Sequence, residues 1–98
     1  MKEEKTIEEK DEEIGPLLAD GFEEAFVGYV TQFNTILACY DYDKCVNVLM
    51  KRDGMTDEEA IEFIEFNVTG AWVGKYTPCF LHKCKLKEFV EFFGDREI

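Results

Sequence analysis

The sequence predicts an α+β fold in which a small three-stranded antiparallel sheet packs against helices, in the order ββααβα after an acidic N-terminal segment. Two neighbouring stretches, 26–33 and 35–40, are rich in β-branched and aromatic residues, as strands are. A helix-start signal stands at Thr56. Hydrophobic residues make up 46% of the 98 residues, which is enough for a core without disulfides or metal.

The chain divides into two expected segments. Residues 1–16 form an acidic N-terminal tail or frayed helix, because the first 13 residues hold seven acids and three lysines with almost nothing apolar. Gly15 and Pro16 end this segment. Residues 17–98 form a single α+β domain, in keeping with the usual size of one domain.

The first two strands are expected to pair as a hairpin, because only Asn34 separates residues 26–33 from residues 35–40. Gly28 lies within the first strand and indicates a bulge or a close approach by another element. Residues 78–82 predict a third strand. Its proline places that strand at an edge of the sheet, because proline cannot donate a hydrogen bond to a neighbouring strand.

The first helix is expected over residues 42–52. Asp41 or Asp43 can cap its start, two basic residues occupy its last turn, and Gly54 suits its C-terminal cap. A short final helix follows the third strand. Its apolar face would consist of Leu86, Phe89, Val90 and Phe93.

The clearest local signal is the capping box formed by Thr56 and Glu59, which predicts a helix from residue 57 to about residue 69 or one turn further. At 100° per residue, one face of this helix would carry the apolar side chains Ala60, Ile61, Ile64, Val68, Ala71 and Trp72. The opposite side would carry Glu58, Glu62 and Glu65, with an at least partly exposed Phe66 beside them.

The charge of the chain limits its partners. There are 22 acidic and 11 basic residues, and the net charge of −11 repels nucleic-acid phosphates and anionic membranes. We therefore expect no direct nucleic-acid contact, and a protein partner with a basic surface is the natural complement. The alternative is that the charge only maintains solubility.

The location of the protein is expected to be cytoplasmic. No run of about 20 apolar residues exists to span a membrane. The N-terminus has no apolar stretch after Met1-Lys2, so we expect no secretory signal. The four cysteines would then be reduced thiols.

Two patterns could carry metal chemistry. Glu58, Glu62 and Glu65, together with a Glu-x-x-Glu pair at Glu88 and Glu91, have the spacing with which helices hold magnesium in some nucleotide pyrophosphatases. A solvated outer face has the same pattern. Zinc is the other candidate metal, and its candidate ligands are Cys79, His82 and Cys84. The spacing of these residues suits no common zinc module. We expect no resident metal and no cofactor.

A basic cluster stands at one end of an otherwise acidic chain and consists of Lys75, Lys83, Lys85 and Lys87. Nucleic-acid contact through four lysines is disfavoured by the net charge of −11. Association with the acidic stripe, within one molecule or between two, is the alternative.

The stretch 40–80 resembles a group of short uncharacterised proteins encoded by bacteria and their phages. The shared arrangement is Tyr-Asp, Asp-Gly-Met, Glu-Glu-Ala, Phe-Asn, Gly-Ala, Val-Gly and Thr-Pro. It falls here on Tyr40, Asp41, Asp53, Gly54, Met55, Glu58, Glu59, Ala60, Glu62, Phe66, Asn67, Gly70, Ala71, Val73, Gly74, Thr77 and Pro78. The resemblance implies a bacterial or phage setting and a fold, and it implies no particular reaction.

The function we expect is that of a small accessory protein without enzymatic activity, which binds another protein through the carboxylate-rich helix face. The expected contact residues are Glu58, Glu62, Glu65 and Phe66. Such a protein could inhibit a host nucleic-acid-binding factor by presenting carboxylates in place of phosphates. The alternative is a metal-dependent nucleotide hydrolase that uses the Glu-x-x-Glu pairs, and a homodimer is a third option.

Overall fold

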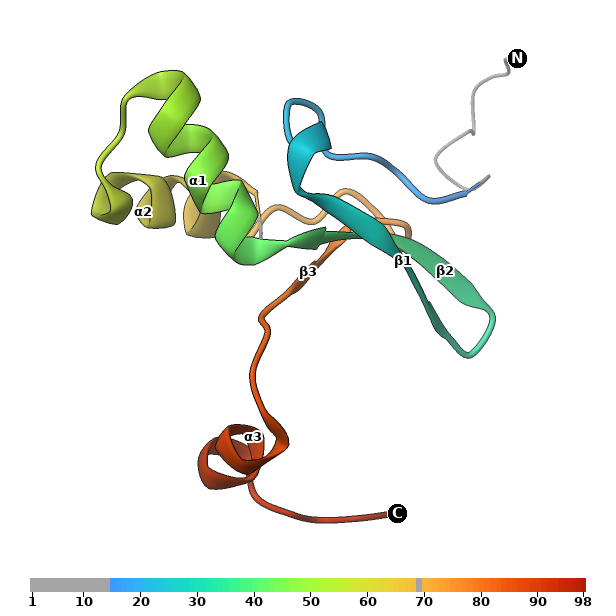
Figure 1. The fold of residues 1–98 in the computed structure, drawn as a ribbon. Coiled ribbons are helices and arrows are strands. Elements are labelled where there is room, and N and C mark those ends of the chain that lie inside the picture. The colour runs from blue at the N-terminus through green and yellow to red at the C-terminus, as the bar shows by residue number, and fades with distance from the viewer. Residues whose placement is uncertain (1–14, 69) are drawn as a thin grey trace.

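The computed structural model of the chain describes residues 15–68 and 70–98. The order of its strands and longer helices is ββααβα, which confirms the predicted α+β class (Figure 1). Most of the expected acidic tail, residues 1–14, lies outside the described residues. The elements are a short 3-10 turn η3 (Glu23–Ala25), β1 (Phe26–Gln32), β2 (Thr35–Asp41), α1 (Tyr42–Asp53), α2 (Asp57–Asn67), β3 (Cys79–Leu81) and α3 (Leu86–Phe93).

Strands β1 and β2 form the expected antiparallel hairpin, with Gln32 paired to Thr35 next to the turn. Phe33 in the turn has a φ of 56°, in the left-handed region that tight turns require. The register shifts between Phe26 and Gly28, where Gly28 has a φ of 144°. The glycine in β1 therefore marks a bulge, as one of the two expected readings predicted.

The direction of β3 corrects the prediction of an all-antiparallel sheet. The strand order is β1-β2-β3, and β3 pairs parallel to β2 with Cys39 opposite Cys79 and Tyr40 opposite Phe80. A parallel neighbour needs a long crossover, and helices α1 and α2 supply it between the two strands. The edge position of β3 agrees with the sequence, because Pro78 directly precedes the strand.

Helix α1 begins where β2 ends. The Asp41 carboxylate accepts a hydrogen bond from the Lys44 backbone N–H at 3.0 Å, which caps the helix as predicted. Gly54 closes the other end with a φ of 70°. Helix α1 packs against α2, and the largest fully buried side chains come from these two helices: Leu49, Ile64 and Cys45.

Tyr40 lies at the centre of the sheet and is 2% exposed. Its ring contacts Phe26 of β1 at 5.5 Å between centroids and Phe80 of β3 at 5.9 Å. Its hydroxyl accepts a hydrogen bond from the Ala19 backbone N–H at 2.8 Å. One side chain therefore joins all three strands to the segment that precedes them.

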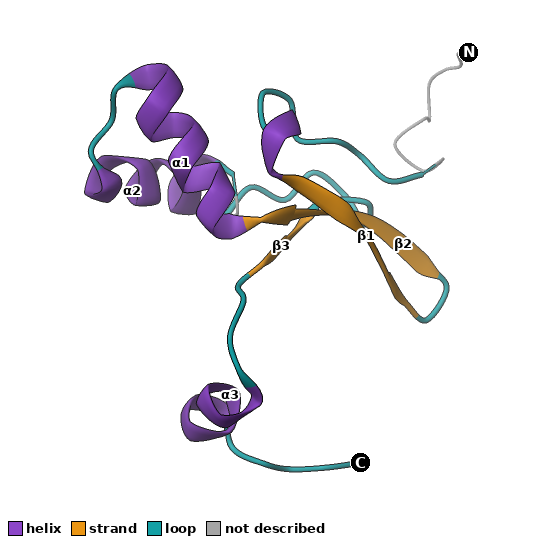
Figure 2. Cartoon of the chain, in the orientation of Figure 1, coloured by secondary structure: helices purple, strands orange, loops and turns teal. Residues whose placement is uncertain are grey.

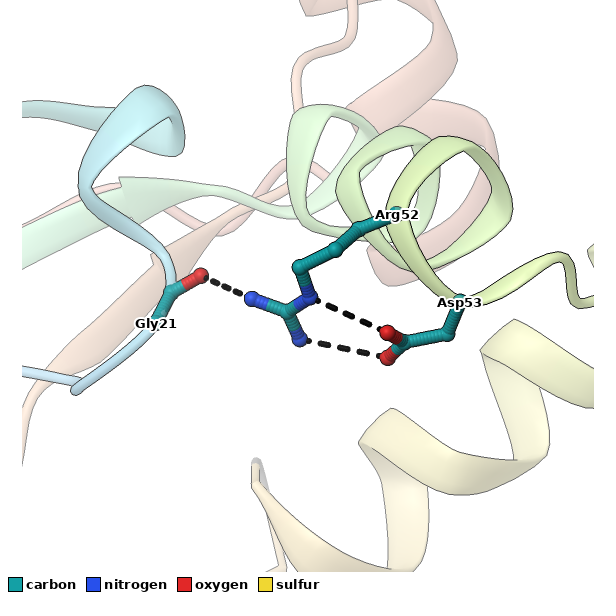
Figure 3. Close-up of polar contacts among 3 residues, drawn as sticks. All are labelled: Gly21, Arg52 and Asp53. Atoms are coloured by element: carbon teal, nitrogen blue, oxygen red, sulfur yellow. Dashed lines mark hydrogen bonds and ion pairs between the residues drawn. The ribbon is translucent and has the colours of Figure 1, made fainter.

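Arg52 ties the end of α1 to the same N-terminal segment (Figure 3). Its Nη1 donates to the Gly21 carbonyl at 2.8 Å, while Nε and Nη2 donate to the Asp53 carboxylate at 3.2 and 3.3 Å. The guanidinium carbon also lies 5.8 Å from the centre of the Phe22 ring. Gly21 has a φ of 90°, and a side chain there would meet Arg52 Nη1 at 3.2 Å.

Helix α3 lies apart from the sheet and from the α1–α2 pair (Figure 2). Its predicted apolar face is present, yet no residue of the helix is buried. Leu86 is 78% exposed and Phe93 is 73% exposed. The described parts of the chain, residues 15–68 and 70–98, include no helix long and apolar enough to cross a bilayer.

Replacing Tyr40 by Phe is expected to lower the free energy of unfolding by about 1 kcal/mol, because the part-buried Ala19 N–H loses its acceptor. Tyr29→Phe is the matched control, since Tyr29 is 68% exposed on the neighbouring strand. It should change stability by less than about 0.5 kcal/mol. Urea denaturation followed by circular dichroism measures both variants. Equal losses would contradict this role of the Tyr40 hydroxyl.

Candidate functional site

The candidate site is the outer face of α2, called here the acidic face and made of Glu58, Glu62, Glu65 and Phe66. All four residues are exposed, and Phe66 is 81% exposed. Helix α2 begins with the predicted capping box: the Thr56 backbone N–H donates to Glu59 Oε1 at 3.0 Å, and the Glu59 N–H donates to Thr56 Oγ1 at 3.2 Å. The start of the helix is thereby held in place.

The inner side of α2 agrees with the predicted pattern for its first two turns. Ala60 and Ile64 are fully buried, and Val68 packs against the core at the end of the helix. Ile61, which was expected on the same face, is 41% exposed. The acidic face therefore rests on a helix whose opposite side is anchored in the core.

The end of α2 comes earlier than predicted. The helix stops at Asn67, and Trp72, which was expected on its buried face, lies beyond the helix and is 75% exposed. A Cβ at Gly70 would come within 2.5 Å of the Glu65 carbonyl oxygen. The chain turns tightly over the last helical turn at this glycine, and only a residue without a side chain fits there.

One carboxylate of the acidic face is also a structural contact. The Tyr42 hydroxyl donates to Glu65 Oε2 at 2.8 Å, which links the start of α1 to α2. Burial and this hydrogen bond raise the pKa of Tyr42 from 10.0 to about 12. Glu65 is thus held in one place by a buried phenol, whereas Glu58 and Glu62 project from the exposed side.

A shallow concavity of about 540 Å³ borders the acidic face. Glu62 and Phe66 line it, and the structure adds Phe63, which is 38% exposed, and Met55 from the preceding loop. Phe63 and Met55 are not among the residues that the sequence predicted for this surface. The spacing of three between Phe63 and Phe66 is the signal that could have placed both rings on adjoining faces of the helix.

A second concavity of about 420 Å³ lies between the N-terminal segment and the residues at and after the end of α2. Its lining is mainly apolar and includes Leu17, Phe22, Val68 and Phe80. Asn67 borders both concavities, so the polar residue that closes α2 lies between an apolar hollow and the acidic face.

The cysteine and histidine pattern is dispersed in the structure. Cys79 faces Cys39 across the parallel strands, and burial together with the hydrogen bond between these two thiols raises the pKa of Cys79 to about 11. The His82 ring packs on the Tyr42 ring at 4.2 Å between centroids, and Cys84 is exposed. Among the described residues, no three His, Cys, Asp or Glu side chains are grouped so that they could hold a metal ion.

The two Glu-x-x-Glu segments are also separate. Glu88 and Glu91 belong to α3, which lies away from α2 (Figure 1). Glu88 Oε1 accepts a hydrogen bond from the Lys85 backbone N–H at 2.9 Å, so this carboxylate caps its own helix.

Two of the four lysines of the predicted basic cluster have partners within the chain. Lys83 pairs with the buried Asp41 carboxylate at 3.0 Å. The hydrogen bonds from the Lys44 backbone N–H and from Lys83 lower the pKa of Asp41. Lys75 lies over the Tyr76 ring at 5.4 Å. Lys83 therefore holds the segment after β3 to the end of β2.

No protein-family model, curated protein or solved structure matches this chain. The resemblance to short bacterial and phage proteins therefore stays a prediction.

The Tyr42 phenol is expected to titrate near pH 12 in the folded chain. The ultraviolet difference between the wild type and Tyr42→Phe isolates its ionisation. Because the pKa in the folded state exceeds the unfolded value of 10.0, the associated stability is complete below pH 10 and is lost as the pH rises to about 12. Glu65→Gln should shift the midpoint downward, and a wild-type midpoint near pH 10 would contradict the contact.

Alkylation of the native chain is expected to label Cys84 before Cys45 and Cys79. Burial raises the pKa of both of the latter thiols to about 11, so at about pH 8 roughly one in a thousand is a thiolate. Cys84 is exposed. Peptide mass spectrometry after brief iodoacetamide treatment measures the order, and the denatured chain is the control. Equal rates in the native chain would show that Cys45 and Cys79 are as reactive as Cys84 and would contradict the prediction.

Proposed function

We propose that this chain is a small protein-binding module without enzymatic activity, which engages a basic surface of a partner protein through the acidic face of α2. The observation that carries the proposal is Phe66, a ring 81% exposed on a core-anchored helix and bordered by Glu62. Exposed aromatic side chains surrounded by polar groups are typical of binding surfaces.

The acidic face is held in a defined shape before any partner arrives. Its helix is capped at Thr56, buried along Ala60 and Ile64, and bonded through Glu65 to Tyr42. Little conformational freedom of the backbone remains to be lost on binding, which favours affinity.

The aromatic and acidic parts of this face have different expected roles. Phe66, beside the concavity that also contains Phe63, supplies apolar area for the centre of an interface. Glu58 and Glu62 stand at its rim, where charges accelerate association and make it sensitive to salt. A basic partner surface complements both the rim and the net charge of −11.

The setting of this function is proposed to be the cytoplasm of a bacterium, with a bacterial or phage origin of the gene. The four cysteines are thiols in the structure, which suits a reducing compartment. Glu58 and Glu65 are seven residues apart, which is about 10 Å along the helix axis. A row of carboxylates of this length could occupy a site for nucleic-acid phosphates on a host factor.

Binding is expected to depend on both parts of the face. The triple variant Glu58→Gln, Glu62→Gln, Glu65→Gln should weaken capture of the partner from a bacterial lysate by about tenfold or more, and the loss should be largest at low salt. Phe66→Ala should weaken the free energy of binding to the partner by about 2 kcal/mol, because an exposed aromatic anchor is removed.

The matched control removes three acids from α3 and its C-terminal flank: Glu88→Gln, Glu91→Gln, Asp95→Asn. Its charge change is the same, yet α2 is untouched, so it should capture the same partner as the wild type. Affinity for the purified partner, measured by calorimetry, then quantifies each loss. Equal capture by all variants, or no partner at all, would refute the proposal.

A further inference from the structure

Two thiols face each other across the parallel strands of the sheet. Cys39 of β2 and Cys79 of β3 are register partners, and a hydrogen bond joins their side chains. Register partners on neighbouring strands lie on the same face of the sheet, with the strands about 4.8 Å apart. Disulfides join residues whose Cα atoms are about 4.4–6.8 Å apart. The backbone of the reduced chain therefore already places these two cysteines within the range of a disulfide.

The cysteine pair lies on the side of the sheet away from the core. Ala38 and Tyr40 belong to the buried core cluster, whereas Cys39 between them does not, because successive side chains of a strand point to opposite faces. The register partner of Cys39 on β1 is Gly28, and a Cβ there would meet no described atom within 4 Å. Cys79 is only partly buried. A small reagent can therefore approach the pair from this side.

Strand β3 is the part of the sheet that a bond at this position would hold. It has three residues and pairs only with β2, because it lies at the edge of the sheet. Closing a disulfide requires the two Cβ atoms to come within about 4.5 Å of each other. A short edge strand has few contacts that resist such a shift, so β3 can adjust to the bond more readily than a strand that is paired on both sides.

We propose that Cys39 and Cys79 are a site of reversible oxidation, which closes to a disulfide and fastens β3 to β2. In a reducing compartment, disulfides of this kind are transient and respond to oxidants. The inference goes beyond the proposed binding function and does not depend on it, because neither cysteine belongs to the acidic face of α2.

The oxidant is a small-molecule disulfide of the glutathione type. The thiolate of Cys79, the less buried of the two cysteines, attacks one sulfur of that disulfide, breaks its S–S bond and releases one thiolate. The thiolate of Cys39 then attacks the Cys79 sulfur of the mixed disulfide and releases the second thiolate. The protein loses two electrons and two protons, and the small disulfide gains them and becomes two thiols. Burial raises the pKa of Cys79 to about 11, so the first step is slow near neutral pH.

The disulfide would close a loop that contains both helices of the crossover. This loop reaches from Cys39 to Cys79 and includes α1 and α2. A cross-link over a loop of this length restricts the unfolded chain, which raises the midpoint of thermal unfolding. Oxidation is therefore expected to stabilise the fold that supports the acidic face.

Incubation with oxidised glutathione tests the site. The chain carries Cys84→Ser, because the exposed Cys84 thiol could link two molecules. After long incubation at about pH 8 and blocking of free thiols with N-ethylmaleimide, peptide mass spectrometry should show one disulfide, between the peptides that carry Cys39 and Cys79. Trypsin cuts after Lys44 and Lys75, so the three remaining thiols lie on separate peptides.

Circular dichroism during heating measures the effect of the bond. The thermal midpoint of the Cys84→Ser chain should rise by roughly 10 °C or more on oxidation and should fall back when dithiothreitol is added. Adding Cys79→Ala should abolish the rise. The matched control adds Cys45→Ala instead, which removes a buried thiol outside the pair and should leave both the bond and the rise in place.

The peptide map is decisive whether or not each variant folds, because it is read in a chain that keeps both Cys39 and Cys79. A chain that stays reduced, a glutathione adduct in place of the bond, or a bond that includes Cys45 would each overturn the inference. A Cys39–Cys79 bond that leaves the thermal midpoint unchanged would also overturn it, because β3 would then not be fastened by the bond.

Discussion

Three consecutive residues, at the point where β2 passes into α1, hold the described chain together. Tyr40 contacts both neighbouring strands and bonds the N-terminal segment through its hydroxyl. Asp41 starts α1 and pairs with Lys83 beyond β3. Tyr42 bonds Glu65 at the far end of α2. Because β2 is the central strand, every distant segment that bonds to these residues is positioned relative to the same short stretch.

The sequence predicted those features that depend on near neighbours. The caps at Asp41 and Thr56 and the hairpin of β1 and β2 are decided within about four residues, and all are present. The predicted antiparallel direction of β3 was wrong, because the direction of this strand depends on how two whole helices return the chain to the sheet. The end of α2 was placed too late: the helix stops at Asn67, and a Cβ at Gly70 would meet the Glu65 carbonyl oxygen, a steric limit that the apolar pattern of the helix does not indicate.

The candidate site likewise combines features that near neighbours decide with features that depend on distant residues. Helical periodicity was enough to predict that Phe66 and its neighbouring glutamates are exposed. The different role of Glu65 depends on the approach of Tyr42, which is 23 positions away in the chain. Met55 also lines the concavity, but it precedes the helix, so the helical periodicity does not indicate it. Periodicity thus predicts which residues face solvent, whereas the shape of the surface depends on the loop and the neighbouring helix.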